Sequence, residues 1–305
     1  TYIKMEVSMF NSLKEITDRC KSDGKEFWQI ILEDDMSDRN VDKEDSMSKM
    51  KELWDAMYHA SVNYDGDIKS SSGLSGGDGK KMEEYTKTHD CLCGDFMGRV
   101  IVEALKMGES NACMRRIVAA PTAGACGVLP AILVPYYDSL LKNENKEQDV
   151  AEAEEKIIKA LYVAAGIGGV IAKRASISGA KGGCQAEIGS ASAMSAGALT
   201  YLQGGNETQI INSASMALKN LLGLVCDPVA GLVEVPCIKR NVGGAVNAVS
   251  CSQMALAGIE SRVPADEVID AMAYVGDKMD ETLRETGIGG LAGTPFGKKV
   301  ADEIL

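Results

Sequence analysis

The sequence predicts an all-α protein, and three observations support this fold class. Apolar residues recur at the 3.6-residue spacing of amphipathic helices along most of the chain. No run shows the apolar–polar alternation of a half-buried strand. Aromatic residues make up only 5 % of the 305 residues, whereas the helix-favouring residues Ala, Leu and Met are abundant. We therefore expect one helical domain over residues 1–305, with Gly-rich loops between its helices.

The first 60 residues are expected to form helices. Leu13, Ile16 and Cys20 lie at helical spacing, and a second apolar stripe runs through 47–58. The Met and aromatic side chains of these stripes are expected to pack in the core. The next segment, KSSSGLSGGDGKK at 69–81, holds too many Gly and Ser residues for a periodic element and is expected to be a loop.

The middle of the chain contains an uncharged stretch at 117–137, after an expected helix at 96–107. Three prolines interrupt the stretch, and it is rich in Gly and Ala, so we expect a buried loop and a core helix rather than a membrane span. The polar residues near 138–150 are expected to be exposed, as an insertion or a hinge.

The second half is expected to alternate helices with short breaks. A second Gly-rich loop, SISGAKGG, covers 176–183, and Pro264 suits the first position of the last helix. The expected helices are 150–172, 185–201, 207–222, 242–258 and 265–285.

Charge and cysteine usage limit the possible partners and the compartment. The 32 basic and 44 acidic residues give a net charge of −12, which repels phosphate groups, so neither nucleic acid nor an anionic membrane is expected to bind. Because the sequence starts with a charged amphipathic helix pattern, no signal peptide is expected. Its nine cysteines are irregularly spaced, which fits the reducing cytoplasm, where cysteines are free, metal-bound or catalytic.

The two histidines give little indication of catalysis. His59 lies within a helical stripe, where a packing or surface role is expected. His89 precedes Cys91 and Cys93, a grouping that suggests zinc, but no second ligand pair lies nearby at usable spacing. No local signature of a Ser–His–Asp triad is present either.

Three Gly-rich loops can present several backbone N–H groups to an anion. They are SSGLSGGDG at 71–79, APTAGACG at 120–127 and SGAKGG at 178–183. None matches a P-loop or a dinucleotide-binding fingerprint, because no strand is expected before them. One such loop is usually only a turn, but three in a helical chain favour a small anionic ligand.

Three cysteines lie where helices are expected to begin or end, so their sulfurs can face a shared cleft: Cys184, Cys226 and Cys237. Spacing alone does not establish a metal site, but three thiolates suit an iron–sulfur cluster whose open iron can act as a Lewis acid. Other cysteines lie within helical stripes and are expected to pack as small apolar side chains: Cys20, Cys113 and Cys251.

The segments around these cysteines resemble the alpha chain of the bacterial iron–sulfur L-serine dehydratases. The resemblance lies in SISGAKGGCQAEIGSASAMSAGA, CDPVAGLVEVPCIKRN and NACMRRIVAAPTAGACGVLPAIL, with support from SGLSGGDGKK and GIGGLAGTP. It extends from about Phe10 to the end of the chain and implies an all-helical cytoplasmic lyase of amino-acid catabolism and gluconeogenesis. It also implies that Cys184, Cys226 and Cys237 hold an oxygen-sensitive [4Fe-4S] cluster.

The resemblance further implies an activity and a partner. The activity is that of an L-serine ammonia-lyase, which converts L-serine to pyruvate and ammonia with the open iron acting on the substrate hydroxyl. Single-chain relatives carry an additional N-terminal domain, so a separate beta chain and an alpha–beta hetero-oligomer are implied. Some relatives also end in a cysteine that caps the open iron, whereas this sequence ends in ADEIL and self-capping is not expected.

The glycine loops are expected to bind the carboxylate of the substrate, with Asn111 as a polar neighbour. The loop residues expected to do so are Ser72, Gly73, Gly76, Gly77, Thr122, Ala123 and Gly124. Lys181, between glycines and close to Cys184, is a candidate base if burial lowers its pKa. It is equally a positive charge beside an anionic cluster, in which case a histidine of the beta chain is the base.

Two alternatives from other classes stay open. A pyridoxal-phosphate lyase would use Lys181 as the Schiff base and the glycine loops for the phosphate, and it predicts a parallel sheet. A non-catalytic helical scaffold would use its cysteines only for packing. Serine and threonine are not distinguished, because one methyl group is worth only about 1–3 kcal/mol of pocket contact.

Overall fold

The computed structural model describes residues 10–141 and 147–304, and it confirms the all-α class. Over these residues there is no strand, and the only β-type pairing is an isolated bridge between Cys226 and Arg284. The α-helices are α1 (Leu13–Asp23), α2 (Phe27–Arg39), α3 (Lys43–Val62), α4 (Asp78–Thr88), α5 (Gly94–Ala112), α6 (Val128–Leu141), α7 (Glu147–Arg174), α8 (Gly179–Gly182), α9 (Ser190–Leu202), α10 (Glu207–Asn220), α11 (Cys237–Leu256), α12 (Ala265–Lys278) and α13 (Pro295–Ile304).

The N-terminal helices form as their sequence predicts. Ser12 caps α1 by accepting the Glu15 N–H at 3.0 Å, and Gly24 ends the helix in the left-handed conformation that glycine adopts without strain. The apolar stripes of α1, α2 and α3 bury residues such as Trp54 in one large core that also includes α7. The expected helices and the expected core role of their stripes are therefore confirmed.

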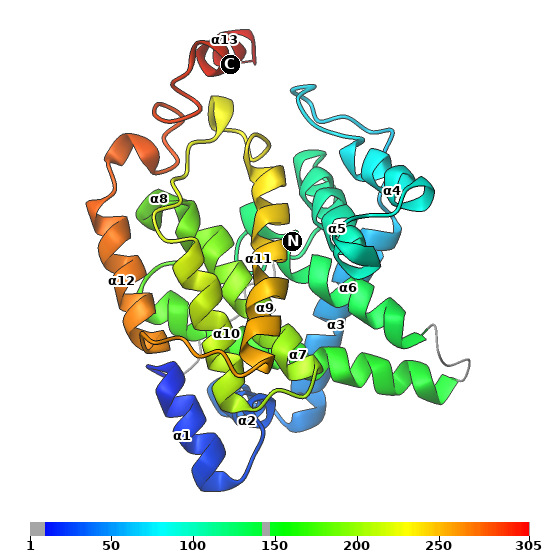
Figure 1. The fold of residues 1–305 in the computed structure, drawn as a ribbon, viewed down its shortest axis with the longest axis vertical. Helices are drawn as coiled ribbons and strands as arrows, with labels where there is room; N and C mark the ends of the chain where they lie inside the picture. Colours follow the sequence, from blue (N-terminus) through cyan, green and yellow to red (C-terminus); the bar gives the residue numbers. More distant parts are fainter. Residues whose placement is uncertain (1–9, 142–146, 305) are drawn as a thin grey trace.

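Helix α9 is the centre of the molecule (Figure 1). Its residues from Ser190 to Thr200 are buried, and α7, α10 and α11 pack around it. Small side chains allow this close approach: a Cβ added at Gly197 would lie 2.2 Å from the Cδ1 atom of Ile167. The Ser192 hydroxyl donates to the Gly244 carbonyl of α11 at 2.7 Å, so one polar group in this core is paired.

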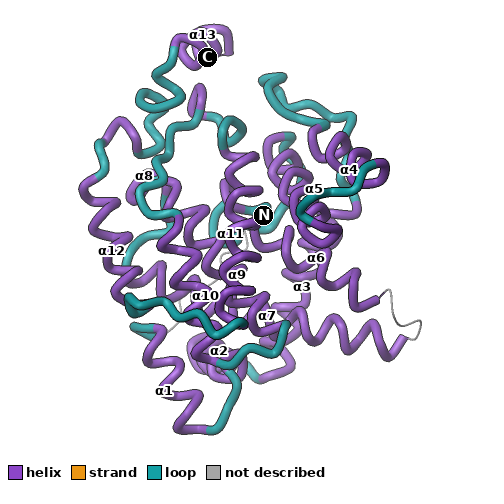
Figure 2. The backbone as a smooth tube through the Cα atoms, in the orientation of Figure 1, coloured by secondary structure: helices purple, strands orange, loops and turns teal. Residues whose placement is uncertain are grey.

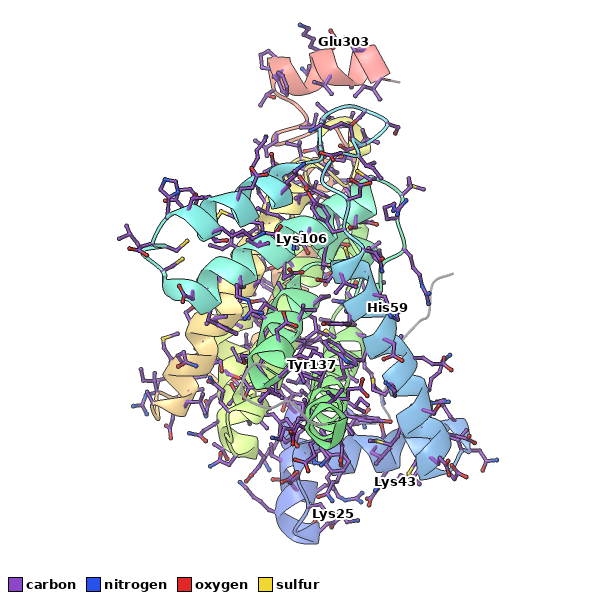
Figure 3. The ribbon with its side chains drawn as sticks, turned by 90° about the vertical axis from the view of Figure 1, so that its right-hand side faces the viewer. Lys25, Lys43, His59, Lys106, Tyr137 and Glu303 are labelled. Atoms are coloured by element: carbon purple, nitrogen blue, oxygen red, sulfur yellow. The ribbon has the colours of Figure 1, made fainter. Side chains whose placement is uncertain are left out.

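The long loops gather at one end of the bundle, as Figure 2 shows. These loops cover 63–77, 221–236 and 279–294, and α13 and the C-terminus lie at the same end, where Figure 3 labels Glu303. Because the helices below are packed along their length, this end is where irregular backbone can present polar groups.

Several element boundaries differ from the prediction. The loop expected at 69–81 ends earlier, because α4 begins at Asp78. Helix α11 begins at Cys237 rather than at 242, and α12 ends at Lys278 rather than at 285. A further helix, α13, forms in a segment for which no helix was expected.

The uncharged stretch folds as a short 3₁₀ turn followed by α6, as expected for a buried loop and a core helix. Pro130 lies in the first turn of α6, where its missing N–H is tolerated. No helix in the described ranges is long and apolar enough to cross a membrane. Of the expected hinge near 138–150, residues 142–146 lie outside the described residues, and the flanking parts continue α6 and α7.

Candidate functional site around three cysteines

The structure brings Cys184, Cys226 and Cys237 together at the end of the bundle that carries the loops. All three side chains are buried and none is in a disulfide. Burial raises the pKa of Cys184 and of Cys237 to about 12, and in Cys237 the nearby Cys184 adds to the shift. The pKa of Cys226 rises in the same direction, first through burial and then through Cys184.

Three free thiols are a donor set of the kind that iron–sulfur clusters use. Within residues 10–141 and 147–304, no group of three or more His, Cys, Asp or Glu side chains converges on one ion position. A cluster is held differently, because each thiolate binds a separate iron atom. Burial disfavours the thiolate form of all three cysteines, and the positive iron atoms of a cluster would stabilise it. The three thiols are free, and Cys184 and Cys237 are close enough to Cys226 to raise its pKa.

Gln185 connects Cys184 to the loop that leads to Cys226. Its backbone N–H donates to the Leu224 carbonyl at 2.9 Å, and its side-chain oxygen accepts the Gly223 N–H at 2.9 Å. Its side-chain nitrogen donates to the Met272 carbonyl of α12 at 3.1 Å. The side chain is completely buried, so these contacts fix the position of the residue after Cys184.

Arg240 of α11 holds both sides of Cys226. Its guanidinium donates to the Val225 carbonyl at 2.7 Å and pairs with the Asp227 carboxylate at 2.9 Å. Asp227 in turn accepts the Leu291 N–H at 2.8 Å, which brings in the 279–294 loop. The same guanidinium charge opposes the rise in the pKa of Cys184, so Arg240 both positions the loop and favours a thiolate.

Asn241, one residue later, joins Cys237 to the APTAGACG loop. Its amide nitrogen donates to the carbonyls of Cys237, at 2.9 Å, and Gly124, at 2.8 Å. Its amide oxygen accepts the Gly127 N–H at 2.8 Å. One buried amide therefore sets the position of the expected substrate loop relative to a cysteine of the site.

Glu187 presents a carboxylate to the same place. It lies in a π-helical turn, Gln185–Gly189, and the Cys226 thiol is 3.9 Å from its carboxylate. A Cβ added at Gly124 would lie 3.3 Å from one Glu187 oxygen, and one at Gly179 would lie 2.6 Å from the other. Burial raises the pKa of Glu187. The nearby Thr122 hydroxyl lowers the pKa of Glu187. This hydroxyl is buried and makes no hydrogen bond of good geometry.

The SSGLSGGDG loop is anchored beside the site by Glu234. Glu234 precedes Cys237 by three residues. Its buried carboxylate accepts hydrogen bonds from the hydroxyls of Ser70, at 2.7 Å, and Ser72, at 2.9 Å. Gly76 and Gly77 both have positive φ, and a Cβ at Gly76 would lie 2.3 Å from the Ile68 carbonyl oxygen.

An internal carboxylate already occupies part of this expected anion site. Glu109 accepts the N–H groups of Asp78 at 2.7 Å and Gly79 at 3.1 Å, at the N-terminus of α4. That carboxylate explains why α4 starts at Asp78, inside the expected loop. The roles expected of Ser72, Gly73, Gly76 and Gly77 toward substrate stay predictions, and the Ser72 hydroxyl is engaged by Glu234.

Asn111 and Lys181 end up in different surroundings. The Asn111 amide donates to the Ala123 carbonyl at 3.2 Å, so the expected neighbour does lie beside the APTAGACG loop. Lys181 is exposed and lines a cavity of about 160 Å³ with Arg174 and Asp277. None of the three cysteines lines this cavity.

Three other cysteines and the two histidines lie outside the site. Cys20 and Cys251 are buried as expected, whereas Cys113 is half-buried at the end of α5. His59 is exposed on α3, and the His89 ring stacks on Tyr85 at 4.4 Å between centroids.

Sequence reasoning proposed Cys184, Cys226 and Cys237 as ligands, a role that stays a prediction, and it missed the polar residues that surround them. These residues are Glu187, Glu234, Arg240 and Asn241. Glu187 and Arg240 were visible only as charged residues next to the cysteine motifs, in CQAEIG and CIKRN. A charged residue close to a ligand cysteine is the signal that would have found them.

Comparison with known proteins agrees with this picture. The family model described as "Serine dehydratase alpha chain" matches residues 22–292. The probable L-serine dehydratase alpha chain of Bacillus subtilis (strain 168) is 43 % identical over 297 residues, covering 97 % of this chain and 96 % of that protein. The L-serine dehydratase alpha chain of Peptoniphilus asaccharolyticus is 40 % identical, covering 97 % of this chain and 99 % of that protein.

A longer relative shows the same similarity. The L-serine dehydratase of Helicobacter pylori (strain J99 / ATCC 700824) is 35 % identical over 295 residues, which cover 93 % of this chain but only 62 % of that protein. The match of the family model over most of the chain, together with the two alpha chains aligned along nearly their whole length, shows that the chain belongs to the serine dehydratase alpha chain family.

Proposed function

We propose that this chain is the catalytic subunit of an L-serine ammonia-lyase, which converts L-serine to pyruvate and ammonia with a [4Fe-4S] cluster held by Cys184, Cys226 and Cys237. The observation that carries the proposal is the meeting of these three buried thiols, from three separate segments, in a chain of this family. When bound, the cluster supplies an open iron that polarises the substrate hydroxyl and makes it a better leaving group.

The chain's own residues would prepare this site. Gln185 and Arg240 hold the backbone on either side of the ligand cysteines, so that the thiols stay aligned without the cluster. Burial of the thiols keeps bulk water away from the site, which strengthens every electrostatic contact there.

The substrate carboxylate would bind at the APTAGACG loop. The Thr122 hydroxyl is buried without a good partner and is available as a donor, and Asn111 and Asn241 hold the carbonyls of Ala123 and Gly124. These two amides fix the backbone of the loop beside the Thr122 hydroxyl. The SSGLSGGDG loop, anchored on Glu234, is the second expected contact with substrate.

The reaction also needs a group that removes the α-proton, and Glu187 is the carboxylate nearest to the cysteines. Loss of the α-proton and of hydroxide from L-serine leaves 2-aminoacrylate, which hydrolyses in water to pyruvate and ammonia. Lys181 lines a cavity that none of the three cysteines lines, which supports a base other than Lys181, either Glu187 or a histidine of the beta chain.

We further propose that the chain works with a separate beta chain in the cytoplasm, as an alpha–beta hetero-oligomer. Two observations support this assignment. Two similar proteins are named as alpha chains, and the Helicobacter pylori relative is longer than this chain. The pyridoxal-phosphate alternative is disfavoured, because it needs a parallel sheet and the described residues contain no strand.

The deciding experiment is anaerobic co-purification with the beta chain, followed by iron and sulfide analysis and a pyruvate assay with L-serine. Stoichiometric iron and sulfide with pyruvate formation would support the proposal. Pyruvate formation by an iron-free protein that contains pyridoxal phosphate would overturn it. A protein with neither cofactor nor activity would support the scaffold alternative. L-threonine in the same assay tests substrate preference.

A further inference from the structure

The turn between α4 and α5 carries a second pair of cysteines, outside the proposed cluster site. The Gly94 N–H donates to the Cys91 carbonyl at 2.8 Å, and Cys93 has φ −84° and ψ 0°, as in the third position of a type I β-turn. Cys91 and Cys93 are therefore two positions apart within one tight turn. The neighbouring Cys93 thiol raises the pKa of Cys91, and Leu92 between the two cysteines is fully exposed.

The two thiols differ in accessibility. Cys93 is exposed and immediately precedes α5, a helix of 19 residues, so small molecules in solution can reach its thiol. Cys91 is half-buried, and its Sγ packs against Gly98, where an added Cβ would lie 3.3 Å away. Burial and the neighbouring Cys93 raise the pKa of Cys91. Cys93 is therefore the better attacking thiol, and Cys91 is placed to react second.

We propose that Cys91 and Cys93 form a thiol–disulfide exchange site for low-molecular-weight disulfides. The Cys93 thiolate attacks one sulfur of the small disulfide, forming a mixed disulfide and releasing one small thiolate. The Cys91 thiolate then attacks the Cys93 sulfur, forming the Cys91–Cys93 disulfide and releasing the second small thiolate. Both cysteine protons pass to solvent, and the small disulfide gains the two electrons that the protein loses.

The fold tolerates this reaction because α4 contributes little to the core. Gly79 is the only buried residue of α4, and the helix is held mainly by polar contacts. Among these contacts, Lys106 of α5, labelled in Figure 3, pairs with Glu83 of α4 at 3.0 Å. A disulfide at the far end of α4 therefore leaves the packed helices unchanged, and the reaction is separate from the proposed cluster chemistry.

The test uses the full chain, purified anaerobically with all thiols reduced and then treated with oxidised glutathione. Differential alkylation and peptide mass spectrometry identify each cysteine's state. We expect an intramolecular Cys91–Cys93 disulfide at glutathione concentrations that leave Cys20, Cys126 and Cys251 reduced. In the Cys91→Ser variant, glutathione should remain on Cys93 in stoichiometric amount, because the second attack is lost.

The Cys93→Ser variant and a buried-cysteine variant, Cys20→Ser, serve as controls. Cys93→Ser should form no disulfide and leave Cys91 mostly reduced, whereas Cys20→Ser should form the Cys91–Cys93 disulfide like the unmodified chain. Glutathione that stays on Cys93 of the unmodified chain would overturn the proposal, as would oxidation of Cys184, Cys226 or Cys237 at lower concentration. Circular dichroism of each variant distinguishes these outcomes from misfolding.

Discussion

At the scale of single residues, contact with other thiols separates the proposed ligand cysteines from those that only pack. Cys184 and Cys226 are buried, but so are Cys20 and Cys251, so burial alone does not identify a ligand. The proposed ligands differ in that Cys184 raises the pKa of both Cys226 and Cys237, which requires these thiols to be close in space. The position of these cysteines at expected helix ends indicated this grouping, because a cysteine within an apolar helix stripe would pack in the core instead.

Removing any one ligand cysteine should remove the cluster and all measurable dehydratase activity. The variants are Cys184→Ala, Cys226→Ala and Cys237→Ala, and a three-thiolate site has no spare ligand. The measurement is iron per chain and pyruvate formation after anaerobic purification.

The matched controls are Cys20→Ala, Cys113→Ala and Cys251→Ala. They should keep iron and activity and cost on the order of 1 kcal/mol of unfolding free energy through lost packing. Full iron content in Cys226→Ala would overturn the three-cysteine assignment. Loss of iron in Cys251→Ala would assign a ligand role to Cys251.

Replacing Glu187 with Gln should stabilise the cluster-free chain while it impairs catalysis. Burial raises the pKa of Glu187, so the charged form costs free energy in the fold. Such a group stabilises the fold at pH below its unfolded pKa, and this contribution is lost as the pH rises through its folded pKa. We therefore expect Glu187→Gln to raise the Tm at neutral pH and to change it little at acidic pH.

Thermal unfolding of the cluster-free chain at both pH values gives this measurement, with the exposed Glu260→Gln as the control. In the loaded enzyme, kcat should fall by about 10²–10⁴-fold if Glu187 handles the proton. Unchanged kcat in a folded, iron-containing Glu187→Gln would assign the base to another group.

At the scale of elements, buried carboxylates fix the glycine loops. Glu234 holds two serines of the SSGLSGGDG loop, and Glu109 holds the first N–H groups of α4. We expect Glu234→Ala to release the loop, because it removes hydrogen bonds to a charged group that are worth about 1.5–3 kcal/mol each. Amide hydrogen exchange over 70–77 should become faster, while exchange in α9 stays unchanged. Equal protection in this variant and in the exposed control Glu260→Ala would contradict the anchoring role.

The sequence predicted the helices well and their ends less well, for a physical reason. Periodicity locates the helix interior, because the apolar stripe has to meet the core. The start of α4 depends on Glu109, and the start of α11 lies in VEVPCIKRN, where no apolar period marks it. The π-helical turn that presents Glu187 has no sequence signature, since it depends on packing against neighbouring segments.

The site was predictable in part for the same reason. Motif context identified Cys184, Cys226 and Cys237, but the link from Asn241 to Gly124 spans 117 positions. A single sequence contains no signal for a contact between side chains so far apart. The placement of Lys181 beside α12 likewise depends on the direction in which the short helix α8 leaves the site.

At the scale of the whole molecule, the larger apolar core is separate from the three cysteines of the proposed site. The large apolar core joins α1, α2, α3 and α7 and contains none of the three ligand cysteines. A smaller core includes Cys184 and Cys226 at its edge, where the loops cover the end of the bundle (Figure 1). Helix α9 contributes side chains to both cores, so apolar packing around α9 is expected to stabilise the fold without the cluster.

This separation predicts that air abolishes activity before it unfolds the protein. An open iron at the corner of a cluster is accessible to oxidants, whereas the helices around α9 are held by apolar packing that oxygen does not change. Iron content, pyruvate formation and far-ultraviolet circular dichroism would be followed in the same aerated sample. We expect activity and iron to decline together while the helical signal persists. Full activity after complete loss of iron would refute the cluster mechanism, and simultaneous loss of helix would show that the fold depends on the site.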